Sequence, residues 1–117
     1  MLPINDVAMD AIEYALDGLA MRTDVIAHNV ANAEVPNFRA STVSFEAELK
    51  RALAGGDVSN VRTPAVADSG GDPNPQGNTV SIEDEVVEML KTNLTRDAMV
   101  NAYNFKIEAL RTAIKGA

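Results

Sequence analysis

The sequence predicts an all-α fold, in which two long terminal helices form an antiparallel, coiled-coil-like hairpin with a long irregular loop between them. Apolar residues near both ends of the chain are spaced alternately by three and four, which is the seam of a coiled coil. The stretch between them, residues 54–79, is rich in Gly, Pro, Asn, Asp and Ser and has no apolar period. Since each seam can be buried only against the other helix or against another chain, we expect neighbouring subunits to complete the fold.

The composition bounds both the size of the core and the class of partner. A chain of 117 residues is about one domain. It is 46% hydrophobic but only 4% aromatic, which suits seams between helices better than a bulky globular core. The net charge of −7 argues against a nucleic-acid partner. Without cysteine there is no disulfide framework, thiolate nucleophile or Cys-based zinc site.

The first predicted helix covers residues 4–33. Asn5 or Asp6 can cap its start, because their side chains accept hydrogen bonds from free backbone amides. Gly18 within the helix costs roughly 1 kcal/mol relative to Ala, and we expect close helix approach to offset this cost. The predicted seam consists of large aliphatic residues, chiefly Ile12, Leu16, Leu19, Ile26 and Val30.

Residues 34–53 are predicted to form a turn and a short helix. Pro36 prevents the first helix from continuing. The segment 44–53 then indicates a brief helix capped by Ser44, although the capping box is incomplete because Ala47 stands where Glu is usual. Residues 54–80 are predicted to be a flexible loop. A loop this long in a small domain suggests that the chain becomes ordered on assembly.

The second long helix is predicted over residues 81–115. Ser81 and Asp84 form a Ser-x-x-Asp cap, and further acidic residues follow at the positive end of the helix dipole. Gly116 is expected to end the helix. The predicted seam continues along its whole length through Ile82, Val86, Met89, Val100, Tyr103, Ile107, Leu110 and Ile114.

Catalytic and metal chemistry find little support in the sequence. His28 is the only histidine, and no phosphate-binding loop, nucleophile elbow or catalytic triad spacing is present. The segment 72–83 partly matches a calcium-binding loop, but Pro73 and Pro75 remove backbone amides and no helix precedes it. We therefore expect no enzyme activity, no cofactor and no metal. The N-terminus lacks the pattern of a cleaved signal peptide, and no stretch is long and apolar enough for a membrane span.

The end of the first helix carries a motif that resembles a known family. Residues 24–39, DVIAHNVANAEVPNFR, are similar to the N-terminal signature of bacterial flagellar axial proteins, which include rod and hook subunits. In that family the helix ends in Asn-aliphatic-Ala-Asn, followed by Thr-Pro-Gly and an aromatic residue. Residues 43–49 and the second long helix resemble the FlgB type of proximal-rod subunit. Here Val35-Pro36-Asn37 replaces Thr-Pro-Gly, and Asn tolerates the positive φ that such a turn requires.

The resemblance implies a function in assembly. Residues 1–117 would be a single rod-type domain, a structural subunit of the proximal rod of the flagellar basal body, in the periplasmic space. It would polymerise through its terminal helices, connect the membrane-ring and export-gate end to the rest of the rod, and transmit torque. Its partners would be other rod proteins, rod-base and export-gate proteins, and copies of itself. Export would follow the flagellar type III route, without signal cleavage.

The assembly residues expected from this reasoning belong to two groups. The seam residues of both helices would pack, and four residues at the end of the first helix would set the turn that meets the next subunit. This second group comprises Asn29, Asn32, Pro36 and Phe38. Two alternatives stay open. The chain could be a soluble helical chaperone or adaptor that binds an export substrate through the same faces, or a different short rod subunit.

Overall fold

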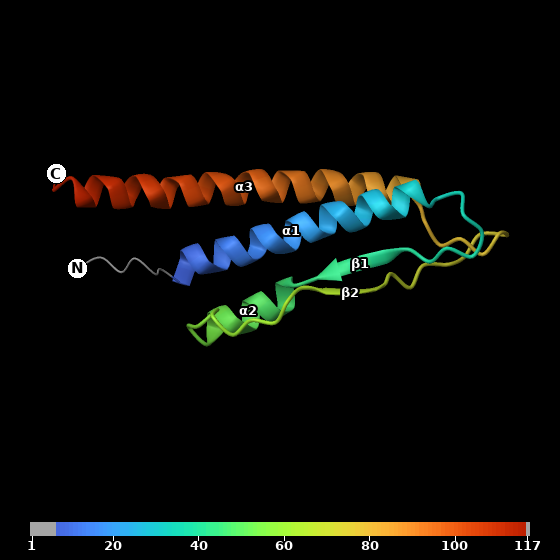
Figure 1. The fold of residues 1–117 in the computed structure, drawn as a ribbon, viewed down its shortest axis with the longest axis horizontal. Helices are drawn as coiled ribbons and strands as arrows, with labels where there is room; N and C mark the ends of the chain where they lie inside the picture. Colours follow the sequence, from blue (N-terminus) through green and yellow to red (C-terminus); the bar gives the residue numbers. More distant parts are fainter. Residues whose placement is uncertain (1–6, 117) are drawn as a thin grey trace.

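The computed structural model describes residues 7–116 as a thin, elongated molecule with extents of 65 × 25 × 15 Å. The elements follow in the order α1 (Val7–Ala31), β1 (Ser41–Ser44), α2 (Glu46–Ala54), β2 (Ala65–Asp68) and α3 (Ile82–Ile114). The helices α1 and α3 pack along each other in opposite directions, and the β1–α2–β2 segment lies along the other side of α1 (Figure 1).

The expectation of two long, packed helices is confirmed. The proposed start of the first helix at residue 4 lies outside the described residues. The cap of α3 forms as predicted, since the Ser81 hydroxyl accepts a hydrogen bond from the Asp84 amide at 3.3 Å. At its other end the chain leaves the helix through Gly116, whose φ of 68° is in the left-handed region that glycine adopts without strain.

The prediction of a purely all-α fold is wrong, because β1 and β2 form a two-stranded antiparallel sheet. Its register pairs Ser41 with Asp68 and Ser44 with Ala65. Ser44 therefore lies in a strand and does not cap the short helix; α2 begins after Phe45, which makes no side-chain cap hydrogen bond. Four-residue strands are too short for a period of two to stand out from the sequence.

The loop predicted over residues 54–80 also contains ordered structure. It includes β2, and near its end Asn78 and Thr79 are buried, at 2% and 7% exposure. These two polar residues are buried because they bond to the end of α1 and to the segment after it, as described below. The irregular-loop prediction is thus correct only for the remaining parts of this stretch.

The core consists of two clusters, and the larger one is centred on Phe45. It contains Ala15, Leu19, Val43 and Phe45, with Met99 of α3 packed against it. The Phe45 ring lies directly over Gly18: a Cβ atom built on that glycine would be 2.5 Å from the ring. Gly18 therefore makes room for the aromatic ring that precedes α2. The prediction that Gly18 allows a close approach of another helix is wrong.

None of the described helices is long and apolar enough to cross a membrane.

Candidate assembly site at the end of the first helix

Asn29 ties the end of α1 to the start of β1. Its side chain is fully buried, at 0% exposure. The amide oxygen accepts a hydrogen bond from the Ser41 backbone N–H at 3.0 Å, and the amide nitrogen donates to the Ser41 carbonyl at 2.8 Å. An asparagine amide has one acceptor and two donors, so this side chain pairs with Ser41 as a neighbouring strand would. The remaining donor reaches the Glu85 carboxylate of α3 at 3.2 Å.

Asn78 connects the segment before α3 to the end of α1. Its amide nitrogen donates to the carbonyls of Asn32 and Val35, at 2.9 and 2.7 Å, and its oxygen accepts from the Val80 amide at 2.7 Å. These carbonyls follow the last turn of α1, where intrahelical partners are lost. This role of Asn78 was not predicted from the sequence. The signal was a dense Asn, Pro and Gly pattern, which predicts a turn but not what the turn touches.

The turn after α1 has the backbone geometry expected of the motif. Asn37 has a φ of 63°, so asparagine does occupy the left-handed position. Its N–H donates to the Gln76 carbonyl at 2.9 Å. Phe38 folds back so that its ring meets His28 edge-on, with 5.7 Å between the ring centroids. Pro36 is exposed at the tip of this turn.

Thr79 and Asn32 complete the junction. The Thr79 N–H donates to the Phe38 carbonyl at 3.0 Å, and its hydroxyl accepts from the Ala40 N–H at 2.7 Å. The Asn32 amide donates to the His28 carbonyl at 2.8 Å, as expected for an amide in the last helical turn. Segments from three parts of the sequence thus meet at one end of the molecule through amide and backbone groups. The arrangement fixes shape and offers no evident nucleophile or acid–base pair.

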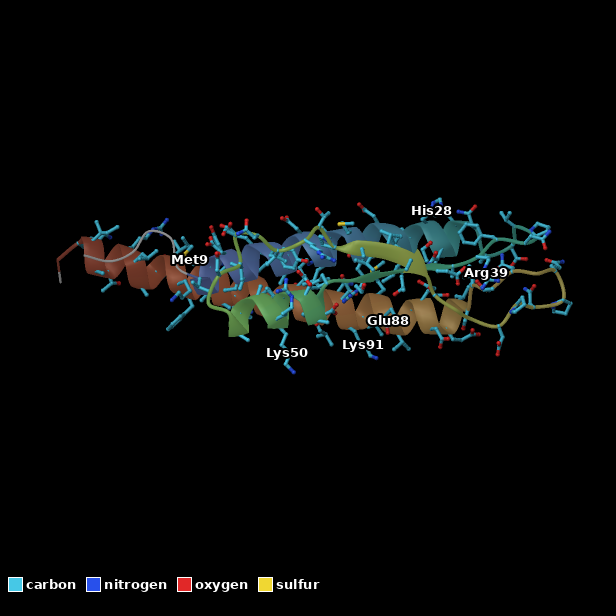
Figure 2. All side chains as sticks on the ribbon, turned by 90° about the horizontal axis from the view of Figure 1, so that it is seen from below. Met9, His28, Arg39, Lys50, Glu88 and Lys91 are labelled. Carbon is cyan, nitrogen blue, oxygen red and sulfur yellow. The ribbon has the colours of Figure 1, made fainter. Side chains whose placement is uncertain are left out.

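The first turns of α3 bring negative charge to this junction. Burial raises the pKa of Glu85, and the neighbouring Glu88 and Asp84 carboxylates raise it further, although the hydrogen bond from Asn29 acts in the opposite direction. Glu88 forms an i,i+3 ion pair with Lys91, at 3.7 Å, along α3 (Figure 2). Within the described residues no group of three or more His, Cys, Asp or Glu side chains is placed to hold a metal ion.

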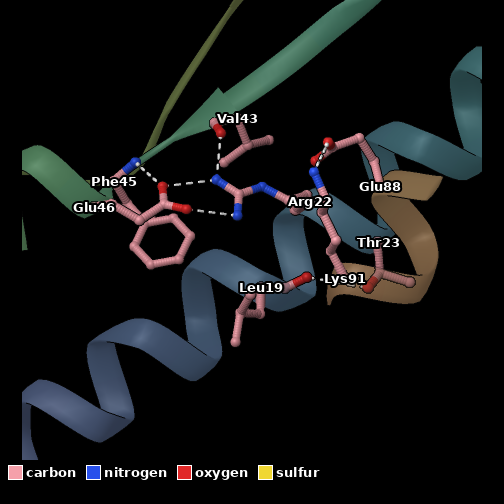
Figure 3. Close-up of polar contacts among 8 residues, drawn as sticks. All are labelled: Leu19, Arg22, Thr23, Val43, Phe45, Glu46, Glu88 and Lys91. Atoms are coloured by element: carbon pink, nitrogen blue, oxygen red, sulfur yellow. Dashed lines mark hydrogen bonds and ion pairs between the residues drawn. The ribbon is translucent and has the colours of Figure 1, made fainter. Parts of the chain in front are cut away.

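Arg22 joins the middle of α1 to the β1–α2 corner. One terminal nitrogen donates to the Glu46 carboxylate at 2.7 Å, and the other donates to the same carboxylate and to the Val43 carbonyl at 2.7 and 2.6 Å (Figure 3). The guanidinium also lies 4.8 Å from the centroid of the Phe45 ring. Because Arg22 donates hydrogen bonds to the ionised carboxylate, the pKa of Glu46 is lowered. No motif in the sequence predicted this role of Arg22.

The amino-acid sequence is similar to those of known proteins. FlgB of Cereibacter sphaeroides, a flagellar basal body rod protein, is 31% identical over 107 residues, which cover 81% of this chain and 84% of that protein. The chain belongs to the FlgB family of flagellar basal body rod proteins. FlgB of Borreliella burgdorferi is 28% identical over 92% of this chain and 96% of that protein. FlgB of Borrelia hermsii is 45% identical over 58 residues, half of this chain and 43% of that protein. No family model matches the chain.

The structure separates the predicted seam residues of this family member into three groups. Leu19 and Ile26 are buried, at 1% and 5% exposure. Six others are half-buried, namely Ile12, Leu16, Met89, Tyr103, Ile107 and Leu110. The remaining five are exposed within one chain, namely Val30 at 42%, Ile82 at 45%, Val86 at 51%, Val100 at 40% and Ile114 at 79%. Of the turn residues, Asn29 is buried, Asn32 and Phe38 are half-buried, and Pro36 is exposed.

Thr92 shows how α3 is turned relative to the predicted seam. It is buried at 2% exposure although it lies outside that seam, and its hydroxyl has no hydrogen-bond partner among the described residues. Val100, which belongs to the predicted seam, is exposed. The contact face of α3 is therefore rotated away from the strictest apolar repeat. A repeat in sequence specifies a stripe on a helix, while the partner decides which side of that stripe is covered.

Proposed function

We propose that the chain is a structural subunit of the proximal rod of the flagellar basal body and polymerises through its terminal helices. In this role it would connect the membrane-ring and export-gate end to the rest of the rod and transmit torque. The observation that carries the proposal is the likeness to FlgB proteins, which at 28% identity extends over 92% of the chain.

The distribution of apolar side chains supports a role in assembly. Large hydrophobic residues stay exposed along the whole of α3, from Ile82 at 45% to Ile114 at 79% exposure. Exposed apolar surface of this extent on a soluble chain marks an interaction site. Val30 near the end of α1 and Pro36 in the turn after it are also exposed. Both helices thus keep apolar surface for neighbouring subunits.

The assembly residues are proposed to act in two ways. Ile12, Leu16, Leu19, Ile26, Val30, Val100, Tyr103, Ile107, Leu110 and Ile114 would pack within the subunit or between subunits. Asn29 and Asn32 would hold the shape of the turn, and Pro36 and Phe38 would present it to the next subunit. Partners would be other rod, rod-base and export-gate proteins and further copies of the chain. The subunit would reach the periplasmic space by flagellar type III export, without signal cleavage.

Purified basal bodies provide the test. A chromosomally tagged chain should co-purify with them without a cleaved N-terminal signal, and deletion of the chain should remove the rod and abolish swimming. Deleting flagellin serves as the control, because it stops swimming and leaves the basal body in place. A chaperone or adaptor would instead stay in the cytoplasm and be absent from basal bodies. That distribution, with rods still present in the deletion strain, would overturn the proposal.

A further inference from the structure

The edge of the sheet formed by β1 has partners for its outward backbone groups. In an antiparallel pair, residues that bond the neighbouring strand alternate with residues whose N–H and C=O point away from it. Ser41 is of the second kind, because its N–H and carbonyl both bond the Asn29 side chain of α1. The carbonyl of Val43 likewise accepts a hydrogen bond from Arg22 of α1. Side chains of α1 therefore close this edge, and β1 lies between α1 and β2 (Figure 1).

The opposite edge, formed by β2, has no such cover. The register places Asp68 and Val66 opposite Ser41 and Val43, so the backbone groups of Asp68 and Val66 also point away from the partner strand. Among the described residues, no hydrogen bond is made by the backbone N–H or carbonyl of either residue. All four residues of β2 are exposed. The β2 edge is therefore available for main-chain pairing.

The side chains beside this edge indicate what would fit it. Val66 is directly opposite Val43, so both side chains lie on the same face of the sheet. Val43 is 3% exposed and belongs to the Phe45 cluster, whereas Val66 is 52% exposed at the border of that cluster. An apolar residue on a third strand would cover Val66 and continue this row. The Asp68 carboxylate, on the same face, stays 45% exposed despite its ion pair with Arg39, so a basic residue would fit beside it.

A second copy of β2 does not complement this edge. In an antiparallel pair of two β2 strands, Asp68 of one copy would be opposite Val66, Asp68 or Pro64 of the other, depending on the register. Valine offers no opposite charge, a second aspartate repels the first, and proline has no N–H for the ladder. The occupant is therefore expected to come from a different protein.

We propose that the free edge of β2 binds an extended segment of another basal-body protein, which joins the sheet as a third strand. The segment would carry an apolar residue beside Val66 and, two positions along, a basic residue beside Asp68. In strand addition, main-chain hydrogen bonds supply affinity and alternate side chains supply specificity. This inference rests on the proposed function, because the segment is expected in the assembled basal body.

Hydrogen–deuterium exchange with residue-resolved mass spectrometry tests the pairing directly. In the purified chain, the N–H groups of Val66 and Asp68 should exchange rapidly, because neither has a partner. In purified basal bodies, their exchange should be slower by roughly ten-fold or more. Ala67 is the internal control: its N–H points toward β1, so its exchange should change much less.

A substitution of Val66 separates the backbone from the side chain. Val66→Pro removes the outward N–H and keeps an apolar residue, and an edge strand tolerates proline where the N–H faces away from the ladder. Val66→Ile is the matched control, because it keeps the N–H. Both purified variants should unfold at the same urea concentration. Basal bodies should contain about ten-fold less of the Val66→Pro chain, relative to the ring proteins, and the parental amount of the Val66→Ile chain.

Four results would overturn the inference. Exchange at Val66 and Asp68 that is as fast in basal bodies as in the purified chain would refute strand addition and leave the proposed function standing, even if Val66→Pro failed to fold. Equal losses of the two variants from basal bodies would show that main-chain pairing is not required. Slow exchange in a concentrated solution of the purified chain alone would assign the edge to a second copy. Absence of the parent chain from basal bodies would refute the proposed function, and this inference with it.

Discussion

At the scale of single residues, buried amides hold the end of α1 in place. Asn29 and Asn78 are almost fully buried, and each bonds backbone groups of another segment. A buried asparagine without such bonds would destabilise the folded chain, because its polar atoms would lose their hydrogen bonds to water and gain none in exchange. The shape of the turn therefore depends on asparagine itself, and residues of similar size cannot replace it.

Replacing Asn29 by Ala is expected to lower the free energy of unfolding by about 3 kcal/mol. The change leaves the N–H and carbonyl of the half-buried Ser41 without their side-chain partner. Urea denaturation followed by circular dichroism measures the loss. Asn32→Ala is the control: Asn32 is only half-buried and bonds one carbonyl, so the loss should stay below about 1 kcal/mol. Equal losses in both variants would contradict the role assigned to Asn29.

Gly18→Ala should destabilise the protein by roughly 1–3 kcal/mol, even though the same change in an open helix stabilises by about 1 kcal/mol. The added methyl group would sit 2.5 Å from the Phe45 ring. Combining it with Phe45→Leu should recover part of the loss, because a smaller side chain leaves room for the methyl group. A double-mutant cycle measured by urea denaturation gives the coupling. A Gly18→Ala variant more stable than the parent would show that the ring does not constrain this position.

At the scale of elements, Arg22 explains why a segment of two short strands and a nine-residue helix keeps a defined position. Isolated hairpins and short helices are marginal in water. Arg22 connects this segment to α1 through the Val43 carbonyl and the Glu46 carboxylate, beside the core ring of Phe45. Arg39 and Asp68 form a further ion pair at the other end of the sheet. Tertiary contacts therefore supply the stability that the local sequence lacks.

The Arg22–Glu46 pair predicts an acid-dependent loss of stability. The pKa of Glu46 is lower in the folded chain than in the unfolded chain, so its contribution is fully present above the ordinary glutamate value. It is lost as pH falls from about 4.3 through the lowered pKa. Because the Glu46 side chain is 61% exposed, the effect should stay below about 1 kcal/mol.

Urea denaturation at a series of pH values measures this effect against Glu46→Gln. The difference in unfolding free energy between the parent and the variant should shrink as pH falls below the ordinary glutamate range. A difference that is constant from neutral pH to pH 3 would show that the ion pair does not contribute to folding.

At the scale of the whole molecule, the thin shape limits what one chain can bury. With a shortest extent of 15 Å, the core is a single layer between α1, the Phe45 corner and part of α3. The outer side of α3 and the exposed end of α1 face solvent. Stability and assembly are therefore carried by different faces of the same helices, and substitutions should separate them.

Leu94→Asp should leave the unfolding free energy within about 0.5 kcal/mol of the parent, because Leu94 is 71% exposed in one chain. Swimming should nevertheless be lost, since the variant places a charge on the exposed apolar surface of α3 that neighbouring subunits are proposed to cover. Motility plates and thermal unfolding measure the two effects separately. Leu19→Asp is the contrast: Leu19 is 1% exposed, so a charge there should unfold the chain. A fully motile Leu94→Asp strain would exclude the exposed apolar side of α3 around Leu94 as an assembly surface.

The local patterns of the sequence predicted the elements that are long or strongly marked. The two long helices, the Ser81 cap and the positive φ at Asn37 all depend on neighbouring residues. Helical periodicity, capping and turn conformation are set by such short-range interactions. Resemblance to flagellar rod proteins likewise rested on contiguous motifs, and the FlgB relatives confirm it.

Only the tertiary structure decided which faces of those helices are covered. The strands β1 and β2 are four residues each and exist because they pair across a gap of twenty residues. Asn78 became part of the α1 junction through carbonyls more than forty positions away. The face of α3 that packs on α1 contains Thr92 and is rotated away from the predicted repeat. Apolar residues on the opposite side of α3 therefore stay exposed. Pairings between distant segments depend on the geometry of packing, and residue spacing along one helix does not contain that information.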